Sequence, residues 1–403
     1  MTLTPGRVRL ALLSLALGGF GIGATEFVVM GLLPNIAADL LPQLNSTDHE
    51  AALAQTGYLI AAYALGVVVG APTIAALASR FPRKQLLLWL LAAFTVATVA
   101  SALMPTFELV LVSRFVAGLP HGAYFGIASL VAASLMGEGK RGRGVAFVLS
   151  GLTIANVIGV PLITFLGQQA GWRAAYLVVA AIFALTLVAV AFFVPLQGGD
   201  PAATMRRELT IFRRPQVWLA LAIGSIGFGG FFAVYSYIAA VVTNVTGLEE
   251  SFVPIVLVAA GLGMTVGNLA GGHFADHHVM KTVFVCFGLF AVSLIGFALT
   301  AQYPAGLLIT VFLVSGSAAA LSPAIQTRLM DVAGDSQSLA AALNHSALNI
   351  GNTLGAFFGG LTIAAGLGYL SPTWVGLGMC VIGSLVALAS WNASRKQAER
   401  LAL

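Results

Sequence analysis

Two residues of opposite charge stand in stretches of this sequence that are otherwise too apolar to hold a charge. Glu26 lies in the run 10–33, and Arg114 lies in the run 108–134. A run of about 20 predominantly apolar residues can span a bilayer, where a charged group is costly. A helical rise of ~1.5 Å per residue puts each charged group roughly 7 Å from the middle of its run. Because the two runs cross in opposite directions, both groups fall at nearly the same depth.

An acid and a base at one depth of the membrane suggest proton chemistry. Arginine stays protonated, whereas a buried carboxyl can gain and lose a proton. We therefore expect Glu26 to be the proton carrier and Arg114 to tune it. His121 lies seven residues after Arg114, on nearly the same helical face, and could extend the path. The alternatives are a permanent structural ion pair of Glu26 with Arg114, and plain packing for His121.

Aromatic, amide and hydroxyl side chains near the middle of other apolar runs are candidates for a solute site. Such groups around a cavity suit an uncharged, amphipathic solute. The expected substrate-binding residues are Tyr63, Tyr124, Thr153, Asn156, Phe228, Phe232, Tyr235, Asn344, His345 and Asn349. The competing interpretation is that the aromatic rings pack or face lipid, and that the amides, together with Asn352, form hydrogen bonds between helices.

The elements that would position these residues follow from composition. Of 403 residues, 59% are hydrophobic and 8% are charged, against about 25% charged in soluble proteins. Only helices satisfy their own backbone in lipid at these lengths. We expect an all-α membrane protein with twelve transmembrane helices, at 10–33, 52–78, 85–104, 108–134, 144–167, 173–195, 216–243, 252–274, 281–301, 304–328, 338–365 and 371–392.

Basic residues alternate from one connecting loop to the next. All of the 19 Lys and Arg residues except Arg114 and Arg173 fall in the termini and in loops on one side. Cytoplasmic loops of membrane proteins carry such an excess, so both termini are expected to be cytoplasmic. This distribution accounts for the net charge of +5 without a nucleic-acid partner. The cysteines, Cys286 and Cys380, lie in apolar runs and indicate neither a disulfide nor a metal site.

The longest connection on the basic side, 196–215, divides the twelve spans into two groups of six. It combines Gly, Pro and charge, as linkers do. The expected organisation is an N-terminal half at 1–195, a cytoplasmic linker at 196–215 and a C-terminal half at 216–403. Turns of equal length follow the second and the eighth spans, at 75–84 and 272–281. Transporters built from such repeats bind their solute between the halves, near the midplane.

These two turns resemble the signature of the major facilitator superfamily, which reads roughly G-x-L-a-D-R-x-G-R-R/K. The first copy retains Leu77 and three basic residues, and the second retains Gly272 and Asp276. The resemblance implies the major facilitator fold of two six-helix halves. It also implies a conformational latch at the cytoplasmic face, with the gating residues Arg80, Arg83, Lys84 and Asp276.

Within the superfamily, the N-terminal half resembles the drug:proton antiporters, and most of all their sugar and arabinose efflux-related group. The similar stretches are 23–27, 31–34, 63–72, 114–122 and 151–161. In the last of these, Gly159 and Pro161 look like the fifth-helix antiporter signature and are expected to take part in gating. The resemblance implies a working monomer in the bacterial cytoplasmic (inner) membrane.

Together, these features indicate proton-coupled efflux of a small, uncharged or amphipathic solute such as a drug, sugar or metabolite. No cofactor is expected, and the proton is the coupling ion. Proton-linked uptake or facilitated diffusion of a sugar-like solute is the alternative, and a non-transporting membrane receptor is a weaker one because the sequence offers no sizeable soluble domain. An enzyme is not expected, since there is no phosphate loop, metal-ligand set or nucleophile with a base.

Overall fold

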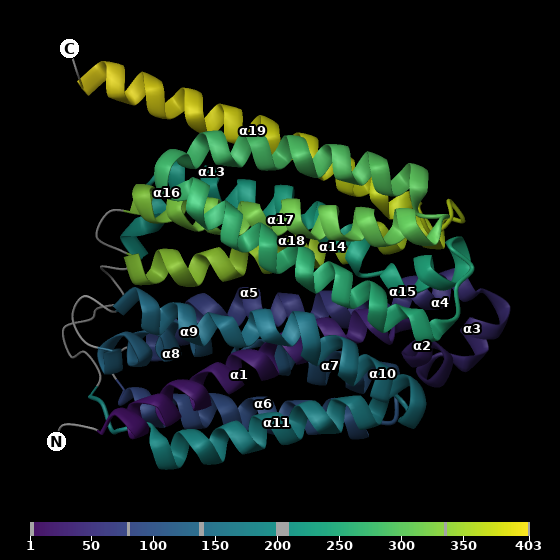
Figure 1. Cartoon of the computed structure of the whole chain (residues 1–403), viewed down its shortest axis with the longest axis horizontal. Coiled ribbons are helices and arrows are strands. Elements are labelled where there is room, and N and C mark those ends of the chain that lie inside the picture. Colours follow the sequence, from purple (N-terminus) through teal and green to yellow (C-terminus); the bar gives the residue numbers. More distant parts are fainter. Residues whose placement is uncertain (1–3, 79–80, 137–140, 199–208, 334–336, 402–403) are drawn as a thin grey trace.

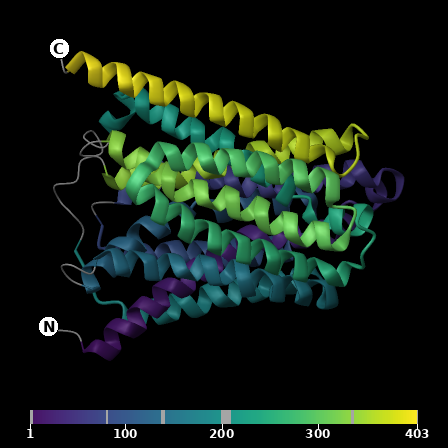
Figure 2. The same cartoon turned by 45° about the horizontal axis from the view of Figure 1, so that its top comes forward.

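The computed structural model describes residues 4–78, 81–136, 141–198, 209–333 and 337–401, and these form helices and connections with no strand among them. Figure 1 shows the long helices side by side, with α1 beginning and α19 ending at the same end of the bundle. Figure 2 shows the same alignment after a rotation about the long axis. The all-helical membrane fold predicted from composition is confirmed.

The N-terminal elements lie in the lower part of the bundle in Figure 1. They are α1 (Pro5–Gly31), α2 (Leu33–Leu40), α3 (Pro42–Thr47), α4 (His49–Thr56), α5 (Tyr58–Ala78), α6 (Arg83–Leu103), α7 (Phe107–Gly118), α8 (His121–Met136), α9 (Arg141–Ile154), a π-helical turn at Ala155–Gly159, α10 (Val160–Ala170) and α11 (Trp172–Phe193).

The C-terminal elements lie above them. They are a short 3₁₀ helix at Leu209–Arg213, α13 (Pro215–Ala222), a π-helical turn at Ile223–Gly227, α14 (Phe228–Tyr235), α15 (Ile238–Ala240), a second π-helical turn at Val241–Val245, a 3₁₀ turn at Glu250–Phe252, α16 (Val253–Thr300), α17 (Pro304–Ala333), α18 (Gln337–Ala364) and α19 (Ser371–Leu401). Of the predicted linker 196–215, residues 199–208 lie outside the described residues.

Within the described residues, ten helical segments are long and apolar enough to cross a membrane. One of them, Glu250–Thr300, contains two crossings, because the backbone leaves helical geometry at His278 (φ −148°, ψ 77°). α18 is less apolar than these ten segments, since it carries three asparagines and a histidine. Counting both arms of α16, and α18 as well, gives the twelve crossings that the sequence predicts.

The structure interrupts several of the predicted spans. α7 ends at Gly118, and α8 begins at His121, because Pro120 between them has no N–H to continue the helical hydrogen bonds. Pro161 follows the π-helical turn at Ala155–Gly159, where the backbone is already irregular. Between the predicted spans 10–33 and 52–78 lie the short helices α2, α3 and α4, and α4 extends to Thr56, inside the second of these spans.

Contacts between N-terminal and C-terminal elements pair specific helices. α5 packs along α18, the π-helical turn at Ala155–Gly159 and α10 pack against α16, α4 contacts α18, and α2 contacts α15. The short helices α2, α3 and α4 lie at the end of the bundle opposite the beginning of α1 (Figure 1). At Gly261 on α16, an added methyl group would collide with the carbonyl oxygen of Asn156, so the two backbones touch there. A close approach of this kind requires glycine.

The outer faces of the bundle carry large apolar side chains that no other helix covers. Trp89 on α6 is 76% exposed, Phe192 on α11 is 70% exposed, and Leu269 on α16 is 72% exposed. A soluble protein rarely leaves so much apolar surface in water. These faces are therefore the surface that lipid covers.

Candidate functional site

Arg114 is buried among aromatic rings. It lies on α7, which begins where Thr106 accepts a hydrogen bond from the N–H of Leu109, and its side chain is 1% exposed. Its Nη1 donates to Thr25 Oγ1 at 3.1 Å. Its Cζ lies 4.4 Å from the ring centre of Tyr63 and 5.5 Å from that of Tyr176, where a guanidinium is attracted to the ring faces. Within the described part of the chain, its Nε and Nη2 have no hydrogen-bond partner.

Glu26 lies next to the residue that binds Arg114, but it forms its hydrogen bond elsewhere. Its side chain is 6% exposed, and its Oε1 accepts a hydrogen bond from Asn352 Nδ2 on α18 at 3.3 Å. No ion pair within 4.0 Å joins Glu26 to Arg114; in the described part of the chain, the ion pair at that distance is Arg173 with Asp39. The two charged groups thus share a neighbourhood without a direct salt bridge.

His121 connects the surroundings of Arg114 to the C-terminal helices. Its Nδ1 lies 3.1 Å from the Tyr63 hydroxyl. Its ring centre lies 5.9 Å from that of His345 on α18, and the His345 ring stacks on Phe125 at 5.2 Å. The contacts run from Arg114 through Tyr63 and His121, which are buried, to His345, which is half-buried. They therefore cross from N-terminal to C-terminal helices.

Several of the predicted substrate-binding residues meet at this interface. The ring of Phe27, next to Glu26, stacks with that of Phe232 at 6.3 Å and meets that of Tyr235 edge-on at 5.8 Å. Phe228 packs against the Phe232 ring at 5.5 Å. The side-chain carbonyl oxygens of three predicted amides are buried without a hydrogen-bond partner; they belong to Asn156, Asn344 and Asn349.

Other predicted substrate-binding residues lie apart from this interface or are used locally. Tyr124 donates from its hydroxyl to the carbonyl oxygen of Leu15 at 2.9 Å, inside the N-terminal helices. Asn349 donates to the carbonyl oxygen of His345, one turn earlier in its own helix. Thr153 lies on α9 and is half-buried. None of the predicted substrate-binding residues lines the groove of ≈ 340 Å³ on the lipid-facing side of α5 and α6, which is formed by Ile74, Phe81, Gln85, Leu86, Trp89 and Leu90.

The described gating residues do not meet one another in this structure. Lys84 Nζ donates to the carbonyl oxygen of Ala191 at 2.7 Å, and so joins the start of α6 to the end of α11. The backbone N–H of Arg83 donates to the carbonyl oxygen of Gln197. Asp276 lies exposed on α16, three residues from Val279, the first helical residue after the break at His278. Arg80 lies outside the described residues.

Gly159 and Pro161 lie where α1 and the fifth predicted span meet. Gly159 ends the π-helical turn and packs against the ring of Phe20 on α1. Pro161 is the second residue of α10, which continues directly from the π-helical turn, and its missing N–H removes a helical hydrogen bond next to that turn. A π-helical turn inside a helix often marks a functional position, and this turn also contains Asn156.

Reasoning from sequence did not assign Thr25, Phe27 or Tyr176 to the site. Tyr176 on α11 faces Arg114, and its hydroxyl has no hydrogen-bond partner. Asn352 was singled out only as an amide in need of a partner, and the structure identifies that partner as Glu26. A tyrosine three residues after Arg173, near the start of a span, is a weak signal. The pairing of residues 26 and 352 leaves no local trace in the sequence.

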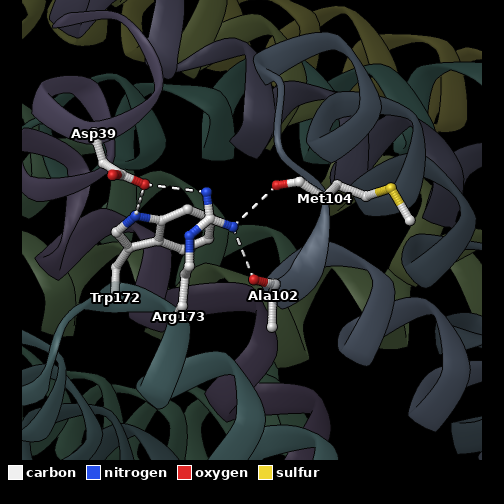
Figure 3. A network of polar contacts seen from close by, with 5 residues as sticks. All are labelled: Asp39, Ala102, Met104, Trp172 and Arg173. Carbon is white, nitrogen blue, oxygen red and sulfur yellow. Dashed lines mark hydrogen bonds and ion pairs between the residues drawn. The ribbon is translucent and has the colours of Figure 1, made fainter.

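A polar network around Arg173 lies near the end of the bundle that contains α2. Asp39 Oδ2 accepts from Trp172 Nε1 at 2.9 Å and from Arg173 Nη2 at 3.1 Å. Arg173 Nη1 donates to the carbonyl oxygens of Ala102 and Met104, at 2.8 Å and 2.9 Å (Figure 3). These carbonyls end α6 and have no partner within that helix. The network thus joins α2, α6 and α11.

Comparison with known proteins agrees with the geometry. The family model described as Major Facilitator Superfamily matches residues 15–280 and 239–402. The chain is 37% identical over 393 residues, 98% of each chain, to "Inner membrane transport protein YdhP" of Escherichia coli (strain K12). It is 32% identical over 363 residues, 90% of each chain, to "Putative transporter AraJ" of the same strain.

Two further similarities concern resistance and fold. The chain is 32% identical over 382 residues to "Chloramphenicol resistance protein" of Streptomyces lividans, covering 94% of this chain and 95% of that protein. The crystal structure of a D-xylose-proton symporter superposes with a TM-score of 0.76 at 17% identity, covering 95% of this chain and 97% of that chain. This last similarity concerns the fold.

Proposed function

This chain belongs to the Major Facilitator Superfamily and, like its relatives, is a membrane transporter and not an enzyme; we propose that it exports a small solute in exchange for protons. Glu26 carries the proton, and Arg114 biases its carboxyl toward the ionised form. Alternating access arises as an N-terminal half, 1–195, rocks against a C-terminal half, 216–403, around a central site.

The observation that carries this proposal is the position of Glu26. Its carboxyl is 6% exposed, has no ion pair within 4.0 Å, and forms its hydrogen bond with α18 on the opposite side of the contact between N-terminal and C-terminal helices. A buried carboxyl without a counter-ion is costly when ionised. The cost depends on how closely the helices pack around it, so proton binding and the arrangement of the helices are linked.

The relatives support export over import. A chloramphenicol resistance protein 32% identical to this chain implies removal of a drug from the cell. We therefore propose that this chain transports an amphipathic or uncharged substrate. This substrate contacts Phe27, Phe232 and Tyr235, whose rings cluster beside Glu26.

The proposed orientation follows from the distribution of basic residues. With both termini cytoplasmic in the inner membrane, the end that contains α2, α3 and α4 faces outward. In this state, α4 contacts α18 and α2 contacts α15 at that end. The structure then corresponds to a state that is closed toward the outside, and the basic residues Arg80, Arg83 and Lys84 with Asp276 act at the opposite end. The transporter works as a monomer.

Proton coupling is tested with the purified protein in proteoliposomes under an imposed pH gradient. Chloramphenicol is the first compound, followed by a panel of sugars, antibiotics and lipophilic cations. We expect at least one compound to move protons with the wild type, and Glu26→Gln to reduce this coupled movement by a factor of about 100 or more, because glutamine cannot release a proton. Glu108→Gln is the control, because Glu108 is exposed at the start of α7.

The outcome also separates export from the second transport mechanism. If a compound is transported equally by the wild type and Glu26→Gln whatever the pH gradient, Glu26 is structural. The protein is then a facilitator of the kind that moves sugar-like solutes down their gradient.

A further inference from the structure

The partner of Glu26 has a hydrogen-bond acceptor that nothing satisfies. Asn352 is 0% exposed, and its Nδ2 donates to Glu26 Oε1 at 3.3 Å. Its Oδ1 is buried and has no hydrogen-bond partner among the residues that the structure describes. A buried polar atom without a partner costs free energy, because it has lost its bonds to water. The amide is thus half satisfied in the arrangement described here.

The proton on Glu26 would supply the missing donor. An ionised carboxylate is only an acceptor, whereas a protonated one has an O–H to donate. When Glu26 is protonated, its O–H can donate to Asn352 Oδ1 while Asn352 Nδ2 continues to donate to Glu26 Oε1. An acid and an amide paired in this way form two hydrogen bonds instead of one. The second bond satisfies the buried Oδ1 of Asn352, and the proton removes the buried charge of Glu26.

These two residues belong to helices on opposite sides of the contact between the N-terminal and C-terminal elements. Glu26 lies on α1, which packs with α9 and α11, and Asn352 lies on α18, which packs with α14 and α19. Opening of this contact would separate the two side chains. We infer that Asn352 is the residue that couples the proton to the conformation: protonation of Glu26 closes an acid–amide pair that holds α1 against α18, and loss of the proton weakens it.

This inference rests on the proposed function. It adds that Asn352 takes part in the coupling and that protonation of Glu26 favours the closed arrangement. Below the pKa of Glu26 the carboxyl is neutral and the pair has two hydrogen bonds, so the closed arrangement is favoured. Above that pKa the pair has one hydrogen bond and a buried charge, so the closed arrangement is disfavoured. A proton taken up from outside therefore promotes closure toward the outside, as antiport requires.

The other charged or titratable groups around Glu26 have to be separated from it. Arg114 on α7 keeps its charge throughout, and Tyr63 on α5 and Tyr176 on α11 are neutral at ordinary pH. The remaining titratable groups near this contact are His121 on α8 and His345 on α18. Any pH response that persists in Glu26→Gln is assigned to these histidines.

The experiment follows the conformation directly, without a substrate. Spin labels at Ser46→Cys on α3 and Leu367→Cys, both exposed near the end that contains α2, report the separation of the two sides by pulsed electron paramagnetic resonance. Cys286 and Cys380 are replaced by Ser. The protein is measured in lipid nanodiscs as the pH is raised from 5 to 9. In the wild type, the ratio of the long-distance to the short-distance population should rise about fivefold, which corresponds to the loss of one net hydrogen bond.

Four variants test the role of Asn352. Asn352→Leu should lose most of the dependence on pH, and Glu26→Gln should keep the short distance at every pH. The exchange of both partners, Glu26→Gln with Asn352→Asp, rebuilds an acid–amide pair and should restore the dependence. Thr353→Val is the control, since Thr353 is the neighbouring residue and its hydroxyl contacts the carbonyl oxygens of Asn349 and Ala61 without touching Glu26.

Failure of the inference differs from failure of the proposed function. If Glu26→Gln removes the dependence on pH and Asn352→Leu retains it, Glu26 is still the proton carrier and Asn352 is not its coupling partner. If the wild type shows no dependence on pH between pH 5 and pH 9, both the inference and the proposed proton carrier are wrong.

Discussion

At the scale of single residues, the two charged groups of the site, Glu26 and Arg114, contact different partners. Arg114 is held by Thr25 and two tyrosine rings, and Glu26 is held by Asn352. A direct ion pair would fix the charge of Glu26, since separating the two would leave a buried charge unpaired. With Arg114 near but not bonded, the carboxyl feels the positive charge and can still change its proton.

Thr25 is the residue that keeps Arg114 in this position. Its hydroxyl is the hydrogen-bond partner of the guanidinium, at 3.1 Å. We predict that Thr25→Val lowers the free energy of unfolding by about 2 kcal/mol, because it removes a hydrogen bond to a buried charged group. The measurement is the midpoint of thermal unfolding of the protein in detergent. Thr25→Ser keeps the hydroxyl and should unfold near the wild-type midpoint; equal midpoints for both variants would show that the bond contributes nothing.

The charged residues of the site could be predicted from the sequence, whereas their partners could not. Glu26 and Arg114 stand out because a charge in an apolar run has few alternative explanations. Their predicted common depth came from the helical rise alone, and the structure places Thr25, the neighbour of Glu26, against Arg114. The partner of Glu26 is 326 residues away in the chain. No periodicity reports such a contact, because it depends on which faces of α1 and α18 meet.

At the scale of elements, two of the irregular segments lie where helices from the two parts of the chain touch. The π-helical turn at Ala155–Gly159 packs against α16, and the break between α7 and α8 puts His121 next to His345. The sequence predicted these stretches as single spans, since hydropathy does not distinguish a regular helix from one with a π-helical turn. Pro120 and Pro161 are the only local signs of the interruptions, because each lacks a backbone N–H.

The contact of α16 with the π-helical turn leads to a prediction for Gly261. A side chain at this position would collide with the carbonyl oxygen of Asn156, so α16 could not approach as closely. We predict that Gly261→Val shifts the labelled pair at positions 46 and 367 toward the long distance by about tenfold in population, since overpacking costs roughly 1–3 kcal/mol. Gly288→Val on the same helix is the control, because nothing lies within 4 Å of an added methyl group there. An unchanged distance in Gly261→Val would mean that this contact does not limit closure.

At the scale of the whole molecule, the number of crossings was predictable because each needs a long apolar run, and most such runs are unmistakable. Two cases needed more than hydropathy. α16 covers two crossings, and the break between them at His278 falls within the predicted turn 272–281. α18 is the least apolar of the twelve, because the interface uses its polar side chains: Asn352 binds Glu26, and His345 lies beside His121. A low hydropathy in one span is thus itself a sign of the functional face.

The orientation of the molecule in the membrane can be tested independently of transport. Seventeen of the 19 Lys and Arg residues lie in the termini and loops of one side, so that side should be cytoplasmic. Ser46 on α3 is exposed near the end that contains α2, and Lys281 is exposed after the break at His278 in α16. We predict that a membrane-impermeant maleimide labels Ser46→Cys in intact cells and labels Lys281→Cys only after the membrane is opened.

Cys286 and Cys380 are buried, so they add little background in this measurement. If Lys281→Cys is labelled in intact cells and Ser46→Cys only after the membrane is opened, the protein has the opposite orientation in the membrane. The closed end would then face the cytoplasm, and protonation of Glu26 would promote closure toward the inside. Such a protein would take up its solute together with protons, as a symporter does, and the same acid–amide pair between Glu26 and Asn352 would drive import.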